Sequence, residues 1–474
     1  MIKFGTSGWR GIIAKEFTYA NVAVVSQAIA KNINENFHKA SIIIGYDTRF
    51  MSEDFAKFAA EIFAGNNIKV LLCRENTPTP VISYNIVNLK LSAGINFTAS
   101  HNSYRYNGIK YFSSCGGTVL PEITKKLEKC CSFIKFKSIK TVPFETCIKN
   151  NIIEIYDPRP DYIKKIKKLV NFEALKKSNI KVVIDILHGT GYGYLNRLLE
   201  DAGIQHTIIN KNRDVMFNGK VPEPSEENLY KLSGMIKKES YALGLSVDSD
   251  ADRFGIIDTD GTFISPNYVI SILLYHLVRT RGWKGTVVKS IMTTNLLDKI
   301  ARKMGIEIME TKTGFKYIGN VMINDHNNFI MGAEESGGLT IRGHIPEKDG
   351  ILACLLTLEA VILNKKSLKD ILKDIKKFTG EIFSSKLNLY LLPEFIKNLK
   401  NILKTKVINN IAGMNVQKNI TIDGYKFIFD NNTWMGFRFS GTEPVVRIYA
   451  EATSKAKLNK LLIKGKAFIY GNQK

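Results

Sequence analysis

The stretch SIIIGYDTRFMSEDFAKFAAEIFAGNNIKVLLC, residues 41–73, decides the fold class of this chain. Its first part, SIIIGYD (41–47), is an apolar, β-branched run that ends in a polar loop, and its last part, IKVLLC (68–73), is a second such run. Between them, SEDFAKFAAEIFAGNN has the apolar spacing of a helix and a stop signal at Gly65. Strand, helix and strand in this order predict α/β layers.

The same alternation returns further along the chain. The strand LSAGINFTAS (91–100) follows the first set, a second set runs from KVVIDILHGTG (181–191) to YALGLSVDSD (241–250), and a third runs from GTVVKSI (285–291) to NNFIMGAEES (327–336). The C-terminal part does not follow this alternation, and strands are expected there at YKFIFD (425–430) and VVRIYAEA (445–452). We predict three similar α/β domains and a distinct C-terminal α+β domain, with expected ranges 1–140, 150–252, 253–367 and 368–474. A chain of 474 residues is long enough for each domain to bury a core of its own.

Composition and charge exclude several classes of protein. The chain has 45% hydrophobic residues, no apolar stretch of about 20 residues and no signal-peptide core, so we expect a cytoplasmic protein without a membrane partner. Six cysteines without a CxxC pair indicate reduced thiols. The net charge of +23 allows a nucleic-acid-binding protein, but the lysines recur at helical intervals, which favours solvated helix faces. We expect no nucleic-acid partner, although a positive field would attract a phosphorylated metabolite.

Polar clusters follow three of the predicted strands. Ser100, Asp248 and Glu334 each lie where an apolar run ends. In open α/β sheets, ligands bind at the carboxyl ends of the strands. Three domains that present chemistry at equivalent edges can surround one shared cleft.

The segment TASHNSYRYNGIK (98–110) places Ser100 beside His101, with Lys110 ten residues after the serine. A serine hydroxyl is a weak nucleophile until a base or a metal activates it. No GxSxG elbow surrounds Ser100, which disfavours an α/β-hydrolase. A turn rich in Ser and Asn is the structural alternative.

The segment DSDADR (248–253) has carboxylates at alternate positions, and Asp248, Asp250 and Asp252 repel one another unless a cation lies among them. An all-oxygen set suits Mg²⁺. An EF-hand is a poor match, because Arg253 stands at its glycine position and Thr259 at its final glutamate position. A solvated acidic turn is the alternative, and we favour metal binding.

Three further turns carry candidate ligand groups. The segment GAEESGG (332–338) offers carboxylates to sugar hydroxyls, and GHIPEKDG (343–350) supplies His344 and Lys348 as proton carriers. The segment RFSGTEPVVR (438–447) combines guanidinium groups, hydroxyls and a Gly turn, which suit a phosphate dianion. The N-terminal turn FGTSGWRG (4–11) carries Arg10. Each segment alone could be an ordinary polar turn.

Together these motifs resemble the α-D-phosphohexomutase family, the phosphoglucomutases and phosphomannomutases. The resemblance covers essentially the whole chain, with all five motifs in family order. It implies three related mixed-sheet α/β/α domains and a smaller, mobile α+β domain around one central cleft. It also implies a serine that carries a phosphoryl group.

The resemblance assigns a role to each matching residue. Ser100 would be the phosphoserine and, with Asp248, Asp250 and Asp252, would bind one Mg²⁺. The other catalytic residues would be Arg10, His101, Lys110, Arg253 and Lys348. The substrate-binding residues would be Thr313, Gly314, Glu334, Ser336, His344, Arg438, Ser440, Gly441, Thr442 and Arg447.

The sequence departs from the family pattern at three positions. Ser103 stands where members commonly have Pro, which loosens a φ constraint on the serine loop. Ser249 replaces the usual Gly of the metal loop, and Phe439 stands where Pro is common in the phosphate loop. None of the three is a proposed ligand.

The function that this implies is interconversion of hexose 1-phosphate and hexose 6-phosphate through a phosphoserine enzyme and a sugar 1,6-bisphosphate. GAEESGG with GHIPEKDG resembles glucose-handling members more than glucosamine-type members, which often carry GEQSGH. Phosphomannomutase and phosphoglucosamine mutase stay open, as does a phosphatase with Asp248 as nucleophile. We expect a monomer or weak homodimer, and the sequence leaves the general acid and base unassigned.

Overall fold

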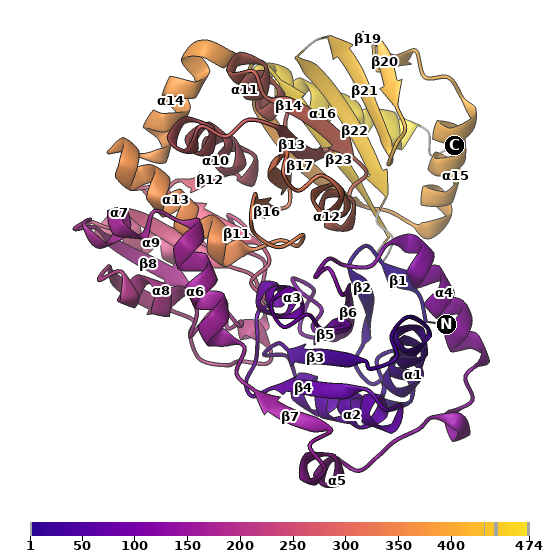
Figure 1. Ribbon diagram of the computed structural model, residues 1–474. Helices are drawn as coiled ribbons and strands as arrows, with labels where there is room; N and C mark the ends of the chain where they lie inside the picture. Colours follow the sequence, from indigo (N-terminus) through magenta and orange to yellow (C-terminus); the bar gives the residue numbers. More distant parts are fainter. Residues whose placement is uncertain (1, 431, 440–443, 472–474) are drawn as a thin grey trace.

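The computed structural model describes residues 2–430, 432–439 and 444–471 (Figure 1). The chain passes through four main sheets in order, each with its own helices, and a short hairpin. In Figure 1 the indigo first unit lies at the bottom and the yellow fourth unit at the upper right. This architecture confirms the expected fold class of three α/β units and a C-terminal α+β unit.

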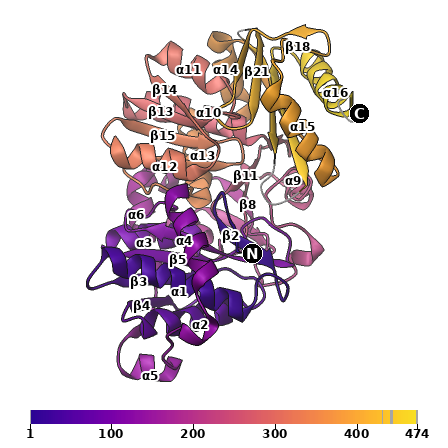
Figure 2. The same cartoon turned by 90° about the vertical axis from the view of Figure 1, so that its right-hand side faces the viewer.

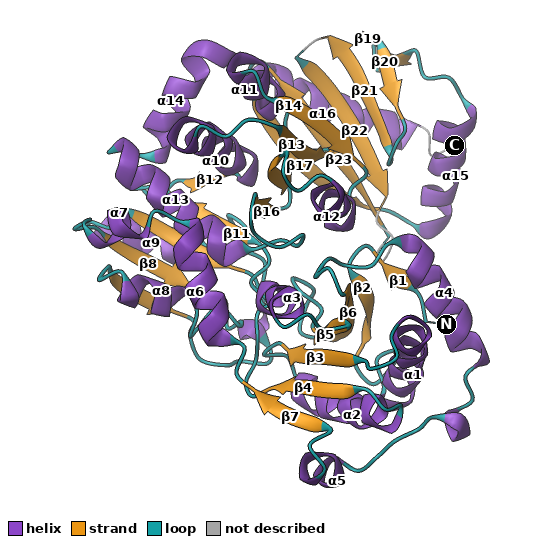
Figure 3. Ribbon diagram, viewed as in Figure 1, coloured by secondary structure: helices purple, strands orange, loops and turns teal. Residues whose placement is uncertain are grey.

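The first unit is a seven-stranded mixed sheet with the order β1-β2-β6-β5-β3-β4-β7. Ile42 and Ile44 of β3 pack in the cluster that includes α1 and α2, whereas Ile43 packs against α3 on the opposite face. The strand alternation therefore builds a three-layer sandwich (Figure 3). Its strands are β1 (Phe4–Gly5), β2 (Gly8–Ile12), β3 (Ser41–Tyr46), β4 (Lys69–Cys73), β5 (Ala93–Phe97), β6 (Tyr106–Ser113) and β7 (Ile153–Tyr156). Its helices are α1 (Tyr19–Asn36), α2 (Ser52–Gly65), α3 (Thr79–Asn88), α4 (Pro121–Phe133) and α5 (Phe144–Lys149).

The second unit has the strand order β12-β11-β10-β8-β9, and the third has β14-β13-β15-β16. The second contains β8 (Lys181–Asp185), β9 (Gln205–Ile209), β10 (Leu243–Val247), β11 (Phe254–Ile257) and β12 (Phe263–Ile264), with α6 (Arg159–Leu169), α7 (Phe172–Lys176), α8 (Leu195–Asp201) and α9 (Tyr230–Lys238). The third contains β13 (Thr286–Ser290), β14 (Glu307–Thr311), β15 (Phe329–Glu334) and β16 (Gly338–Ile341), with α10 (Pro266–Arg281), α11 (Leu296–Met304), α12 (Phe315–Asn324), α13 (Gly350–Asn364) and α14 (Leu368–Thr379).

The first and second units each extend beyond the residue range expected for them. Residues 153–156, inside the range expected for the second unit, form the strand β7, which joins the first sheet because it pairs in parallel with β4. Residues 254–257 and 263–264, inside the range expected for the third unit, form the strands β11 and β12, which continue the second sheet because β11 folds back antiparallel on β10. The hairpin turn between β10 and β11 is the DSDADR segment.

The second and third units share a large hydrophobic core, and each also keeps a smaller apolar cluster of its own, so the expectation of a separate core for each domain holds only in part. One apolar cluster includes Leu245 of β10, Leu273 of α10 and Met331 of β15. The helix α13 is apolar on nearly every side, contacts β10, β11 and β16, and is buried from Gly350 to Val361. A helix that is hydrophobic all round needs neighbours on all sides, and the two sheets supply them.

The fourth unit is an antiparallel sheet with the order β17-β23-β22-β21-β20. Both strands expected in the tail are confirmed as β21 and β23. The strands are β17 (Phe383–Tyr390), β20 (Lys418–Ile420), β21 (Tyr425–Asp430), β22 (Thr433–Phe439) and β23 (Val445–Ala452), with the hairpin β18 (Asn410–Ile411) and β19 (Met414–Asn415). The helices α15 (Pro393–Thr405) and α16 (Lys455–Gly471) accompany them; Figure 2 shows the unit from the side. Among the described residues, no helix combines the length and apolar character that crossing a bilayer requires.

Candidate active site

The serine loop connects β5 to β6 and places Ser100 three residues beyond the end of β5. Ser100 is buried and has a left-handed backbone, with φ of 49°. Such a conformation in a non-glycine residue costs about 1–3 kcal/mol and persists only where the surroundings enforce it. The Ser100 Oγ donates a hydrogen bond of 2.8 Å to Asp248 Oδ2 of the second unit. The loop therefore aims its hydroxyl at the acidic turn.

The acidic turn DSDADR closes the β10–β11 hairpin, in which Val247 pairs with Phe254. Asp248, Asp250 and Asp252 are fully buried, and one oxygen from each lies within 4.8 Å of the others. Burial raises the pKa of Asp248 well above its ordinary value, and the charges of the other two aspartates add to this effect. The alternate spacing thus gathers three carboxylates at one point, as the sequence predicts.

Two lysines from other elements balance these carboxylates. Lys110 Nζ lies 2.5 Å from Oδ2 of Asp250 and 2.5 Å from Oδ2 of Asp252. Lys348 Nζ lies 2.9 Å from Oδ2 of Asp252. Although burial opposes ionisation, Lys110 and Lys348 hold the pKa of Asp252 below its ordinary value. Lys110 comes from the first unit and Lys348 from the third, so three units meet at the acidic turn.

The remaining oxygens of the turn fit a divalent cation. Asp250 Oδ1 and Asp252 Oδ1 are buried and accept no hydrogen bond from the described residues. Buried polar atoms are rarely left without a partner. The ligand atoms are all oxygens, as Mg²⁺ requires. The donor set therefore fits the expected magnesium site.

Cationic and imidazole groups surround the serine. Arg10 Nη1 donates to Asn102 Oδ1, and Arg253 Nη1 pairs with Glu223 Oε1 at 3.1 Å. His101 Nδ1 lies 3.4 Å from Ser100 Oγ. Burial lowers the pKa of His101 well below its ordinary value, and the nearby arginines, Arg253 first, strengthen the effect. These effects favour the neutral form of the His101 imidazole.

The sugar-binding candidates gather at the end of β15. Glu334 Oε1 accepts a hydrogen bond of 2.7 Å from Gly314 N. Burial raises the pKa of Glu334 to about 7, and the neighbouring Glu335 contributes. Thr313 Oγ1 is buried and has no partner among the described residues, and Ser336 lies in the turn that follows β15. These groups offer both donors and acceptors to hydroxyls.

The phosphate-binding candidates lie on the fourth unit. Arg438 of β22 and Arg447 of β23 stand directly opposite each other. Like charges at opposed positions are unfavourable unless an anion lies between them. Asp423 Oδ2 accepts from Arg438 Nε at 3.2 Å and from Thr313 N at 3.1 Å, which links this unit to the sugar-binding loop. Ser440, Gly441 and Thr442 lie outside the described residues.

His344 does not join this cluster. Its side chain is fully buried, and its Nε2 lies 2.8 Å from Asp349 Oδ2. Asp349 also accepts a hydrogen bond of 2.8 Å from the Tyr162 hydroxyl and caps α13 through Leu352 N. His344 is thus part of a buried polar contact that joins α6 to the start of α13.

Sequence reasoning missed several residues that hold the site together. Asp47 and Arg49 lie directly behind the serine loop, and Thr79 donates from its backbone N to Asp250 O at 2.9 Å. A signal for the first pair was available, because DTR follows β3 and β3 pairs in parallel with β5, which places both strand ends at one edge. Glu223 and Asp423 carried no such local signal.

Models of known protein families match four successive parts of the chain. Models of the phosphoglucomutase/phosphomannomutase alpha/beta/alpha domains I, II and III match residues 1–138, 160–261 and 265–378. The model of the C-terminal domain of the same proteins matches residues 394–462.

The chain also resembles individual proteins over nearly its whole length. A phosphoglucomutase/phosphomannomutase of Thermococcus kodakarensis is 30% identical over 97% of this chain and 96% of its own length. A phosphoglucosamine/phosphogalactosamine mutase of Sulfurisphaera tokodaii is 28% identical over 99% of both chains. A solved structure from Thermus thermophilus, provisionally named a phosphomannomutase, is 30% identical with a TM-score of 0.85 over 99% of both chains.

Proposed function

This chain belongs to the phosphoglucomutase/phosphomannomutase family, and from that premise we propose that it interconverts hexose 1-phosphate and hexose 6-phosphate through a phosphoserine at Ser100, with glucose as the preferred hexose. The observation that carries the proposal is the 2.8 Å contact between Ser100 Oγ and Asp248. A hydroxyl that is hydrogen-bonded to one of three clustered, buried carboxylates, with arginines beside it, suits storage of a phosphoryl group.

Each half-reaction exchanges one bond to phosphorus. The bond between phosphorus and Ser100 Oγ breaks while a bond forms to a free sugar hydroxyl oxygen. The hydroxyl proton passes to a base, and Ser100 Oγ regains a proton, which leaves a sugar bisphosphate and an unmodified serine. The second half-reaction returns the other phosphate to Ser100. Neutral His101, 3.4 Å from Ser100 Oγ, is a candidate for carrying the proton.

A Mg²⁺ ion held by Asp248, Asp250, Asp252 and an oxygen of the phosphoserine would supply charge neutralisation for the transferring phosphoryl group. Arg253 and Arg10 provide fixed positive charge on the same side of the site. Lys110 keeps two carboxylates together from the first unit. Positioning and charge compensation supply most of the catalysis that phosphoryl transfer needs.

The opposed pair Arg438 and Arg447 would grip the phosphate that does not react. Glu334, Gly314 and Thr313 would hold the sugar hydroxyls between the two phosphate sites. A fixed grip at one end and a fixed donor at the other would let the bisphosphate turn around and present either end. Exclusion of water during this step would protect the phosphoserine from hydrolysis.

A coupled assay with the 1-phosphates of glucose, mannose and glucosamine tests both activity and sugar preference. The Sulfurisphaera tokodaii relative, named for amino sugars, makes glucosamine 1-phosphate the informative competitor. Phosphopeptide mapping of the purified protein tests the covalent step. Phosphate on Asp248 in place of Ser100 would replace the mutase proposal with a phosphatase. We expect the protein to act in the cytoplasm as a monomer or weak homodimer.

A further inference from the structure

A buried ion pair lies behind the serine loop and takes no part in the chemistry proposed so far. Arg49 Nε lies 3.1 Å from Asp47 Oδ2, and both side chains are fully buried. Both residues follow β3, in the polar loop before α2. A buried charge pair is costly to desolvate, so its retention points to a specific task.

All five N–H donors of Arg49 have an acceptor. Nε donates to Asp47, Nη1 donates to the carbonyls of Ser103 at 2.8 Å and Tyr106 at 3.0 Å, and Nη2 donates to the carbonyls of Asn102 at 2.6 Å and Ser100. Four of these five acceptors are main-chain oxygens of residues 100–106. One guanidinium group thus gathers the carbonyls of the whole serine loop.

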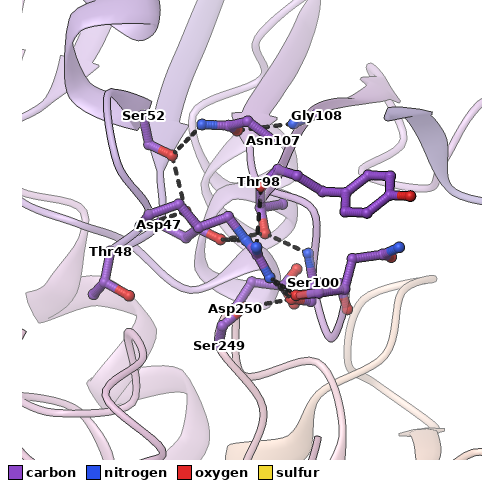
Figure 4. Close-up of polar contacts among 12 residues, drawn as sticks. Asp47, Thr48, Ser52, Thr98, Ser100, Asn107, Gly108, Ser249 and Asp250 are labelled. Atoms are coloured by element: carbon purple, nitrogen blue, oxygen red, sulfur yellow. Dashed lines mark hydrogen bonds and ion pairs between the residues drawn. The ribbon is translucent and has the colours of Figure 1, made fainter. Parts of the chain in front are cut away.

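The Asp47 carboxylate also holds this loop, through the Thr98 hydroxyl. Figure 4 shows it among Ser52, Thr98 and Ser100. Asp47 Oδ2 accepts from Thr98 Oγ1 at 2.7 Å, and Thr98 Oγ1 accepts from Ser100 N at 2.8 Å. Ser52 Oγ donates to Asp47 Oδ1 at 2.9 Å. Ser100 is therefore fixed at both its N–H and its carbonyl by chains of contacts that end in one ion pair.

We propose that Arg49, anchored by Asp47, is a positioning residue that holds Ser100 in its left-handed conformation and aims Oγ at Asp248. The proposal rests on the proposed function. All the loop contacts of Arg49 go to main-chain oxygens, so none depends on whether Ser100 carries phosphate. The clamp can thus hold the loop through the whole cycle.

The chemistry of the side chain explains why an arginine is needed. A lysine keeps the charge opposite Asp47 but offers three donors from a single atom. It cannot reach four carbonyls that surround a planar fork. Arg49→Lys therefore loosens the loop while leaving the charge balance of the pair intact.

The test compares Arg49→Lys with the wild-type protein in three measurements. These are kcat and KM for glucose 1-phosphate, the extent of Ser100 phosphorylation by glucose 1,6-bisphosphate, and deuterium exchange of the peptide that covers residues 98–110. We expect kcat to fall about 100-fold, because a displacement of about 1 Å at a reacting group has that effect. KM should stay within about two-fold, and exchange should rise in this peptide alone. Unchanged kcat, or unchanged exchange in this peptide, would overturn the proposal.

Arg281→Lys is the matched control. Arg281 pairs with buried Glu359 at 3.3 Å between α10 and α13, away from the serine loop. The Arg281→Lys substitution should lower the melting temperature and leave kcat and the exchange of residues 98–110 unchanged. If Arg49→Lys does not fold, Thr98→Val removes only the hydroxyl between Asp47 and Ser100 N, and kcat should fall about ten-fold. Wild-type kcat in that variant would refute the clamp.

The two proposals fail in different ways. A wild-type protein that neither turns over sugar phosphates nor becomes phosphorylated on Ser100 would refute the proposed function. The exchange measurement still tests the clamp in that case, because it needs no activity. An active wild type whose Arg49→Lys variant keeps full kcat would refute the clamp alone.

Discussion

Gly350→Ala is predicted to separate the metal loop from the loop that carries Lys348. Gly350 begins α13, and its N–H donates to Ala251 O at 3.0 Å. A Cβ at this position would lie 2.7 Å from the carbonyl carbon of Arg253 and 3.0 Å from Ala251 O, and closer still to Arg253 O. Carbon atoms in good contact are about 3.5–4.0 Å apart, so the two loops must move apart by about 1 Å.

That displacement acts on the chemistry, because Lys348 Nζ contacts Asp252 at 2.9 Å. A misplacement of about 1 Å can lower the rate by about 100-fold, or about 2.7 kcal/mol of transition-state stabilisation. Overpacking of this kind also costs about 1–3 kcal/mol of folding free energy. Steady-state kinetics with glucose 1-phosphate and thermal unfolding measure the two effects.

Gly234→Ala is the control for adding one methyl group. Gly234 lies inside α9, and a Cβ there meets no atom within 4 Å. It should raise stability by up to about 1 kcal/mol, because alanine favours a helix over glycine, and should leave kcat/KM unchanged. Wild-type kcat/KM in Gly350→Ala would refute the argument that these two loops must stay in contact.

Three further predictions concern single groups of the site. Ser100→Ala should abolish mutase turnover while the melting temperature stays near that of the wild type, and substantial turnover in that variant would contradict the covalent role. The pKa of Glu334 is raised to about 7 in the folded protein. Between about pH 4.5 and pH 7 the Glu334 carboxyl is therefore protonated in the folded protein and ionised in the unfolded chain. The contribution of Glu334 to the free energy of unfolding thus falls as pH rises through that window. The melting temperature of the wild type relative to Glu334→Gln should therefore be higher at pH 5 than at pH 8, and a constant difference would show that the carboxyl is not shifted. Added Mg²⁺ should raise the melting temperature of the wild type, because at 100 times its Kd a bound ligand adds about 2.7 kcal/mol to the free energy of unfolding. A chelator should reverse the effect. Asp250→Asn should lose this response, and an equal response in both proteins would place the ion elsewhere.

The parts of the site that could be predicted from the sequence are those marked by a pattern of neighbouring residues. Ser100, Asp248 and Glu334 could be placed because each lies at or just beyond the end of an apolar strand, and strand ends share an edge of a sheet. The three aspartates could be grouped because an alternate spacing directs side chains to one side. These inferences need only a few neighbouring residues.

The missed parts depend on partners far apart in the chain. Arg49 contacts carbonyls of residues 100–106, and Asp423 joins Thr313 to Arg438. The position of Arg49 after β3 places it at the edge of the sheet that carries the serine loop but does not identify its partners, and no local pattern distinguishes Asp423 from a solvated side chain. His344 shows the reverse case, because a motif suggested a ligand where the fold places a buried pair with Asp349. The strand β17 was not predicted, because half of its FSSKLNLY run is polar and the strand lies at the edge of its sheet.

The helix α13 has a consequence for biosynthesis. The strand β10 is complete once Val247 has been made, but the helix that covers it ends only at Asn364. During translation, the nascent second unit therefore exposes a hydrophobic face until the third unit has been synthesised. Proteins in that condition are prone to aggregate, so the nascent chain should engage chaperones during this interval. Gene fusions and chimaeras should keep the second and third units together.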